Sequence, residues 1–304
     1  MTLPATPPAP APATATDRRK IRPPDSAAVA RVVAAALAED LVMGDPTGEG
    51  LFGPDDTCVT VLLQKEPGVL CGLGVVEAVF AALHPRVSVT PLHSDGDTIG
   101  AVPAEIARIS GPTRAVLAGE RTALNLLSRL SGIATLTARC VAELDGTGAI
   151  LLDTRKTTAG LRELEKYAVR CGGGSNHRLN LGEALLVKDN HLRLAGGIAA
   201  AVARLREAQS RLRLEVETET LDDVHEALRA GVNRIMLDNM TTDQMRQAVA
   251  LCRSSANGAV ETEASGGVTL ANLREIAETG VDYISMGALT HSPKGLDVSL
   301  EVAS

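Results

Sequence analysis

The feature that most constrains the fold is a change of pattern near residue 148. From there on, short apolar runs alternate with amphipathic segments of helical period, which is typical of βα units and a parallel sheet. Two units nearly repeat, Gly231-Val-Asn-Arg-Ile-Met-Leu-Asp238 and Gly280-Val-Asp-Tyr-Ile-Ser-Met-Gly287. Repeated units favour an α/β barrel, although a doubly wound sheet has the same local pattern. The predicted strands cover residues 149–153, 184–188, 212–218, 233–238, 259–264 and 282–286.

The first half of the chain predicts a smaller domain of a different kind. Residues 26–41 carry apolar side chains at helical spacing, with Asp25 or Ser26 as the N-cap. A long helical stretch from 119 to about 144 leads out of this domain. Between these helices, turn dipeptides separate four short β-like runs, at 58–64, 68–74, 87–91 and 107–111.

Composition excludes several classes of protein. The net charge of −7 repels polyanions, and two Tyr, two Phe and no Trp provide no stacking platform, so nucleic-acid binding is not expected. No apolar run approaches the ~20 residues that cross a bilayer, so no membrane role is expected. The five cysteines are odd in number and form no C-x-x-C pair, which indicates a cytoplasmic protein without disulfides. Residues 1–17 are rich in Pro, Ala and Thr and are expected to be a disordered tail.

Polar or small residues follow nearly every predicted strand of the second half. The carboxyl ends of barrel strands form the active-site face of such folds, so these residues are expected to meet in one pocket. They are Asp153 with Arg155 and Lys156, then Lys188, Glu217, Asp238, Ser265 to Gly267, and Gly287.

One part of this rim is basic. Between residues 153 and 191 there are seven Lys or Arg residues and five acidic ones, in a chain that is acidic as a whole. Three of the seven, at 162, 166 and 170, are four residues apart and are interpreted as a solvated helix face, Lys166 above all. The candidates for an anion site are Arg155, Lys156, His177, Arg178 and Lys188. Because a guanidinium can hold a carboxylate through two bonds, two arginines suit a dicarboxylate.

The other part of the rim is acidic and small. Glu217 and Asp238, without His or Cys partners nearby in sequence, suit Mg²⁺ or ribose hydroxyls. Ser265, Gly266 and Gly267 precede a predicted helix over 269–279, whose N-terminus can face a phosphate. Together these features indicate a site for a monophosphate on late barrel strands.

Several segments carry a resemblance to a known family. The chain is similar to quinolinate phosphoribosyltransferases, also called carboxylating nicotinate-nucleotide pyrophosphorylases. The similar segments are ERTALNLLSRLSGIAT (120–135), DTRKTTAGLRELEKYAVRCGGGSNHRLNLGEALLVKDNH (153–191), LEVETET (214–220), IMLDNM (235–240), EASGG (263–267) and SMGALTHS (285–292).

The resemblance implies both a fold and a reaction. The implied fold is an N-terminal α/β sandwich, residues 18–131 joined by 292–304, and an incomplete α/β barrel, residues 132–291, assembled as a homodimer or higher oligomer. The implied reaction joins quinolinate to phosphoribosyl pyrophosphate with Mg²⁺, giving nicotinate mononucleotide, pyrophosphate and CO₂ in de novo NAD synthesis.

The resemblance also implies roles for individual residues. Lys156, Glu217 and Asp238 correspond to residues at the reacting centre, and the two acids are linked to ribose and Mg²⁺, directly or through water or substrate. Quinolinate binding is implied for Arg155, His177, Arg178 and Lys188, and for Arg121, which the family inserts into the partner subunit's site. Phosphoribosyl pyrophosphate binding is implied for Lys156, Lys188, Glu217, Asp238, Ser265, Gly266, Gly267 and Gly287.

Two other functions remain compatible with the sequence. A related phosphoribosyltransferase acting on another aromatic acid would share the phosphate loops and differ around Arg155 and Arg178. A barrel that only binds phosphoribosyl pyrophosphate would bind it without releasing pyrophosphate.

Overall fold

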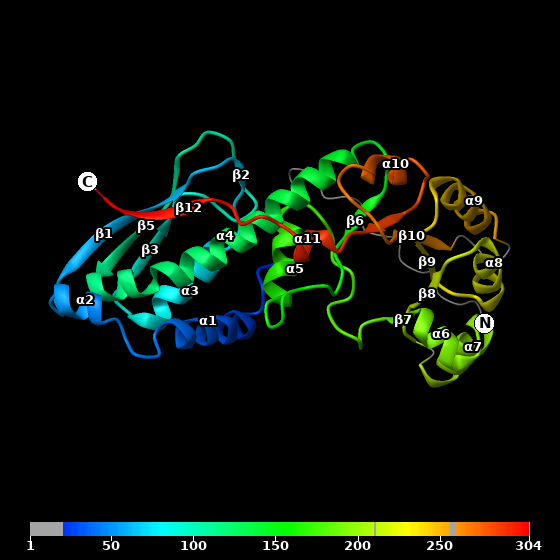
Figure 1. Cartoon of the computed structure of the whole chain (residues 1–304), viewed down its shortest axis with the longest axis horizontal. Helices are drawn as coiled ribbons and strands as arrows, with labels where there is room; N and C mark the ends of the chain where they lie inside the picture. The colour runs from blue at the N-terminus through cyan, green and yellow to red at the C-terminus, as the bar shows by residue number, and fades with distance from the viewer. Residues whose placement is uncertain (1–20, 210, 256–259, 304) are drawn as a thin grey trace, which may run out of the picture.

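The computed structural model describes residues 21–209, 211–255 and 260–303, so the predicted tail at 1–17 lies outside the described residues. The molecule is elongated, with a small sheet at one end and a parallel sheet with helices at the other (Figure 1). The long helix α4 (Thr113–Glu143) runs from one part into the other (Figure 1).

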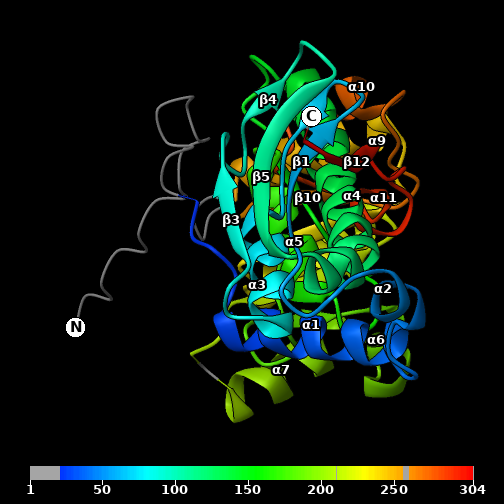
Figure 2. The ribbon, with the colours of Figure 1, turned by 90° about the vertical axis from the view of Figure 1, so that its left-hand side faces the viewer.

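The first part is built on a four-stranded antiparallel sheet in the order β12-β1-β5-β3. The C-terminal strand returns to this sheet, and Leu300 of β12 lies opposite Leu62 of β1. Figure 2 shows α1 and α3 on the side of the sheet that α4 also covers. The elements are α1 (Ser26–Asp40), α2 (Pro46–Leu51), β1 (Thr57–Gln64), β2 (Gly68–Val69), α3 (Leu73–Leu83), β3 (Ser88–Pro91), β4 (Thr98–Ile99), β5 (Ala104–Pro112) and β12 (Val298–Val302).

The stretch from residue 68 to residue 83 differs from the sequence prediction. The predicted strand at 68–74 ends at Val69, and α3 begins at Leu73, where no helix was predicted. Gly72 has φ +116°, and the Asp95 carboxylate accepts hydrogen bonds from the backbone N–H groups of Gly72 and Leu73. The start of α3 therefore depends on a side chain more than 20 residues away in sequence, which a local pattern does not contain.

Helix α4 begins at Thr113, six residues before its predicted start. The first turns of α4 pack on α3, and a Cβ at Gly119 would lie 2.7–3.0 Å from Leu83 and Phe80. Tertiary contact therefore supports these turns. The predicted helix at 26–41 is confirmed as α1, and Asp25 is its N-cap, because its carboxylate accepts from the backbone N–H of Ala27.

The second part contains six parallel strands in the order β6-β11-β10-β9-β8-β7. This is the cyclic order of a barrel that is open between its first two strands, β6 and β7, because β6 pairs with the last strand, β11. In a doubly wound sheet, the strand order would instead reverse in the middle of the sheet. The predicted α/β class with an incomplete barrel is confirmed. The strands are β6 (Ile150–Leu152), β7 (Leu185–Val187), β8 (Leu214–Thr218), β9 (Arg234–Asp238), β10 (Glu261–Ser265) and β11 (Tyr283–Ser285).

The six predicted strands match these six, with ends shifted by at most two residues, and Ala259 of the prediction lies outside the described residues. Thr220 and Thr241 start α8 and α9 with capping boxes. The outer helices are α5 (Arg162–Cys171), α6 (Asp189–Ala195), α7 (Ile198–Ala208), α8 (Leu221–Ala230), α9 (Thr242–Arg253), α10 (Leu273–Ala277) and α11 (Ala288–His291). Across the described ranges, no helix combines the length and apolar character needed to cross a membrane.

Candidate active site

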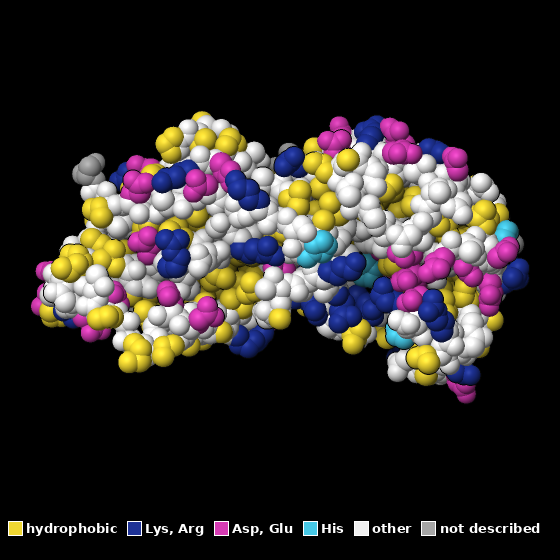
Figure 3. Space-filling view, viewed as in Figure 1, with side chains coloured by type: hydrophobic (Ala, Val, Ile, Leu, Met, Phe, Trp, Pro, Cys, Tyr) yellow, Lys and Arg dark blue, Asp and Glu magenta, His cyan; other side chains and the backbone are white. Residues whose placement is uncertain are grey.

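A cavity of about 780 Å³ lies at the carboxyl ends of the barrel strands. It brings together side chains from six loops that are far apart in sequence, as the strand-end argument predicts. Figure 3 shows Lys and Arg side chains gathered in the middle of this face of the molecule, with Asp and Glu side chains beside them over β8 and β9. The predicted site residues that line the cavity are Arg155, Lys156, His177, Arg178, Lys188, Glu217, Asp238, Ser265, Gly266, Gly267 and Gly287.

Arg155 and Arg178 form the basic wall of the cavity. Burial and the nearby positive charge of Arg155 both lower the pKa of Arg178, so the two guanidinium groups lie close enough to repel each other. The Nε atom of Arg155 is buried and has no hydrogen-bond partner among the residues that the structure describes. A bound carboxylate would relieve the repulsion and accept from the unpaired donor.

Lys156 and Lys188 connect this wall to the rest of the cavity. Two hydrogen bonds fix the backbone of Lys156. The N–H of Lys156 donates to Thr154 Oγ1 at 3.0 Å, and the carbonyl of Lys156 accepts from Thr290 Oγ1 at 2.8 Å. Lys188 lies at the end of β7, and its Nζ donates to Glu217 Oε2 at 2.9 Å. Lys188 therefore lies between the basic and the acidic groups.

Glu217 and Asp238 lie at the carboxyl ends of the adjacent strands β8 and β9, Glu217 as the second-last residue of β8 and Asp238 as the last of β9. The pKa of Asp238 is raised, first by burial and second by the negative charge of Glu217. Two carboxylates that repel each other in a partly buried site are a hard oxygen donor set, and a divalent cation would relieve their repulsion. The residues present therefore fit Mg²⁺.

Backbone loops form the remaining wall. Gly266 has φ +81°, and a Cβ there would lie 2.3 Å from Asn239 Oδ1, so a side chain at 266 would collide with its neighbour. The predicted helix 269–279 is wrong at its start, because residues 270–272 form turns and α10 begins only at Leu273. Asn272 accounts for the difference, since its side chain ties Thr269 N–H to the Gly267 carbonyl in a turn. A phosphate here would meet loop N–H groups, as in a backbone nest.

Lys166 corrects another sequence interpretation. It was expected on a solvated helix face, but it is 1% exposed, and its Nζ bonds to Asp153 Oδ1 and to the His177 carbonyl. Asp153 is 0% exposed, lies outside the cavity lining, and accepts from the backbone N–H of His177 at 2.9 Å. This buried pair therefore holds the backbone that carries His177 and Arg178.

Sequence reasoning gave no role to several lining residues, among them Glu263, Thr269, Ser285 and His291. Asn239, which follows the end of β9 as the sequence indicated, also lines the cavity, and its side chain donates to Asp238 Oδ2 at 2.7 Å. Glu263 lies inside β10, where polarity alone gave no sign of a site. Arg121, in contrast, is exposed on α4 and does not line the cavity of its own chain.

Models of the two domains of one family match this chain. Residues 45–131 match the N-terminal domain of quinolinate phosphoribosyl transferase, and residues 133–301 match its C-terminal domain. The chain belongs to the quinolinate phosphoribosyltransferase family. The family models thus cover the small sheet domain, the barrel and the returning strand β12.

Individual relatives agree with the family assignment. The chain is 44% identical over 267 residues to a probable carboxylating nicotinate-nucleotide pyrophosphorylase of Bacillus subtilis, covering 87% of this chain and 90% of that protein. It is 38% identical over 291 residues to quinolinate phosphoribosyltransferase [decarboxylating] 1b of Nicotiana tabacum, covering 89% and 81%. The nicotinate-nucleotide pyrophosphorylase structure from Francisella tularensis superposes with a TM-score of 0.87 at 39% identity, covering 93% and 99%.

Proposed function

We propose that this chain transfers the phosphoribosyl group of phosphoribosyl pyrophosphate to quinolinate and releases pyrophosphate and CO₂, forming nicotinate mononucleotide for NAD synthesis. Family membership supports the reaction class. The single observation that carries the choice of acid is the half-buried Arg155–Arg178 pair, because two neighbouring guanidinium groups on the cavity wall suit an acid with two carboxylates.

The cavity residues divide between the two substrates. Arg155 and Arg178 would hold the carboxylates of the pyridine ring, while Lys156 and Lys188 supply charge where the two substrates meet. The loops at Gly266, Gly267 and Gly287 leave backbone N–H groups open to a 5′-phosphate. Bound this way, the pyridine nitrogen faces the sugar carbon that loses pyrophosphate, and orientation supplies much of the rate enhancement.

The chemistry explains why a cationic site without an organic cofactor is sufficient. As pyrophosphate leaves, the sugar carbon takes on oxocarbenium character and the pyridine nitrogen attacks it. The ring nitrogen then carries a positive charge, so the neighbouring carboxylate leaves as CO₂, and the resulting carbanion, stabilised beside N⁺, takes up a proton from solvent water to give nicotinate mononucleotide. Arg155 and Arg178 hold the diacid in place in a cavity that limits contact with water.

Glu217 and Asp238 would hold Mg²⁺, directly or through water or substrate oxygens. When bound, Mg²⁺ neutralises charge on the pyrophosphate leaving group. The two acids are also placed to accept hydrogen bonds from ribose hydroxyls. Chelation of Mg²⁺ is therefore expected to abolish turnover, and added Mg²⁺ is expected to restore it.

A homodimer is the smallest assembly that we propose, with Arg121 reaching the neighbouring subunit's cavity. The exposed position of Arg121 outside its own cavity supports this arrangement. We propose a cytoplasmic location as well, supported by five free cysteines, four of them buried, which suit a reducing compartment.

One assay tests the proposed function. Purified protein with phosphoribosyl pyrophosphate and Mg²⁺ is expected to release CO₂ and pyrophosphate in equal amounts when quinolinate is added. Nicotinate in place of quinolinate is the control, and activity only with nicotinate would support a related transferase and refute the assignment. Tight binding of phosphoribosyl pyrophosphate without pyrophosphate release would indicate a binding protein instead.

A further inference from the structure

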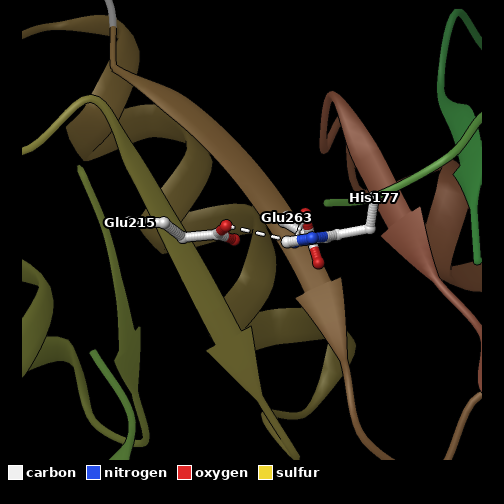
Figure 4. Close-up of side chains that lie close together, drawn as sticks. All are labelled: His177, Glu215 and Glu263. Carbon is white, nitrogen blue, oxygen red and sulfur yellow. Dashed lines mark hydrogen bonds and ion pairs between the residues drawn. The ribbon is translucent and has the colours of Figure 1, made fainter. Parts of the chain in front are cut away.

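A buried polar cluster lies at the inner side of the cavity, and the proposed reaction gives no role to its two glutamates or its arginine. Glu215 on β8 and Glu263 on β10 point toward the ring of His177 (Figure 4). His177 Nε2 lies 3.2 Å from Glu215 Oε2 and 3.6 Å from Glu263 Oε2. Arg234 on β9 completes the cluster, with Nη1 at 2.9 Å from Glu263 Oε2.

The hydrogen bonds of His177 determine which ring nitrogen carries a proton. Nδ1 accepts from the backbone N–H of Arg178 at 2.8 Å, so Nδ1 is unprotonated. Nε2 then carries the hydrogen and donates it to Glu215. Burial lowers the pKa of His177, so the ring is neutral at pH 7. The positive charge for a bound diacid must therefore come from the arginines and lysines.

The same hydrogen bonds argue against a metal in this cluster, although the three candidate ligand atoms lie within 4.8 Å of one another. A metal on Nε2 would move the ring proton to Nδ1, where it would face the N–H of Arg178. Arg234 already supplies a positive charge to Glu263. The geometry fits a hydrogen-bonded support for the ring better than a ligand set.

Burial favours a proton on Glu263. Both glutamates are at most 5% exposed, and Arg234, which pairs with Glu263, also pairs with Glu261. Burial and the neighbouring Glu215 raise the pKa of Glu263 to about 7, so this carboxyl retains a proton for part of the time at neutral pH. The pair thus adds less negative charge beneath an anion site than two free carboxylates would.

Position separates Glu215 and Arg234 from the substrates. Glu215 and Arg234 line a second cavity, of about 1100 Å³, and are absent from the lining of the site cavity, whereas His177 and Arg178 line both. The Oε1 atoms of Glu215 and Glu263 have no hydrogen-bond partner in the described part of the chain. Glu263 itself lines the site cavity, whereas Glu215 can influence the site only through the wall formed by His177 and Arg178.

We propose that Glu215 and Glu263, anchored by Arg234, are positioning residues for quinolinate. They hold His177 as the neutral Nε2–H tautomer, so that Nδ1 of His177 accepts from the backbone N–H of Arg178 and fixes that backbone. The inference rests on the proposed function. Glu215 supplies the acceptor for Nε2–H, Glu263 lies on the same ring nitrogen at 3.6 Å and is held by Arg234, and the ring transmits their position to the cavity wall that carries Arg178.

The experiment compares two substitutions at one position. Glu215→Gln keeps an acceptor for Nε2–H and resembles a permanently protonated carboxyl, so the KM for quinolinate is expected to stay within about threefold of the parent value. Glu215→Leu keeps the volume and removes the acceptor, so this KM is expected to rise by about tenfold or more, as for loss of a hydrogen bond to a charged group. The KM for phosphoribosyl pyrophosphate is expected to change by less than about twofold in both.

Two further measurements keep the test independent of folding and of the proposed function. Nitrogen-15 chemical shifts of labelled histidine are expected to show Nε2–H for His177 in the parent and in Glu215→Gln, with the signal assigned by its loss in His177→Asn. Glu261→Gln is the matched control, since Glu261 pairs with Arg234 but makes no described contact with His177, and it is expected to leave the quinolinate KM unchanged.

Several results would overturn the inference. One is a folded Glu215→Leu variant with an unaltered quinolinate KM, and another is an imidazolium or Nδ1–H signal for His177 at pH 7. An equimolar metal that is lost in Glu215→Gln would show a metal site instead. Absence of quinolinate-dependent CO₂ release from the parent protein would refute the proposed function itself, whatever tautomer the spectra show.

Discussion

Removing the Lys166 ammonium is the sharpest test of how the site wall is supported. Lys166 and Asp153 are 1% and 0% exposed, and each also bonds to the backbone of His177, one to its carbonyl at 2.8 Å and the other to its N–H at 2.9 Å. Lys166→Met keeps much of the side-chain volume and leaves the Asp153 charge buried without its cation. Breaking a buried pair in this way costs about 3–5 kcal/mol.

The expected loss is large enough to measure directly. With a denaturant slope of about 2–3 kcal/mol per molar, the urea midpoint should fall by roughly 1–2 M. The matched control is Arg246→Met, which breaks the exposed Arg246–Asp243 pair and should cost less than about 1 kcal/mol. The double variant Asp153→Asn with Lys166→Met removes the unpaired charge, so it should recover at least half of the loss.

The loss should also depend on pH. Burial raises the pKa of Asp153, and Lys166 opposes that rise, so without Lys166 the pKa rises further. A carboxyl with a raised pKa in the folded state binds its proton more tightly there, so its contribution to stability is present at low pH and is lost as pH rises through the folded pKa. The deficit of Lys166→Met should therefore be largest near pH 7 and shrink toward about pH 5.

The reasoning fails if Lys166→Met unfolds at the same urea concentration as Arg246→Met, or if its deficit grows as the pH falls. A quinolinate KM that stays at the parent value in a destabilised Lys166→Met protein would show that the pair supports the fold without positioning His177 and Arg178.

Three further predictions concern the site itself. Lys156→Ala or Arg178→Ala should lower kcat/KM for quinolinate by about 10²-fold, the scale of one preorganised polar contact, and near-normal steady-state kinetics would refute that role. Gly266→Ala should raise the KM for phosphoribosyl pyrophosphate by about tenfold, because the added Cβ would lie 2.3 Å from Asn239 Oδ1. Gly267→Ala is the comparison and should have a smaller effect, since its Cβ would have its nearest neighbour at 4.0 Å. Equal effects of the two substitutions would argue against the steric reason. Mixing inactive Arg121→Ala with inactive Lys188→Ala should restore activity in heterodimers that contain one intact site, and no recovery after demonstrated subunit exchange would argue against a shared site.

The sequence determined the fold class and most of the cavity lining. Its information is local: apolar runs mark the strands, and the residue that follows a run lies at the carboxyl end of a strand. Since parallel barrel strands all end at one mouth, this rule placed Arg155, Lys188, Glu217 and Asp238 together without coordinates. The two nearly repeated units at 231–238 and 280–287 likewise became the strands β9 and β11.

Only the tertiary structure decided which charges are buried and which partners they have. Lys166 has the spacing of a solvated helix face, yet it lies against Asp153 from another element, and no pattern within α5 records that contact. The start of α3, where Asp95 accepts from the N–H groups of Gly72 and Leu73, and the Glu215–Glu263–His177 cluster have the same origin. Helical and strand periods specify which face of an element is apolar, whereas the pairing of buried polar groups depends on which elements meet, and that is set by the packing of the whole chain.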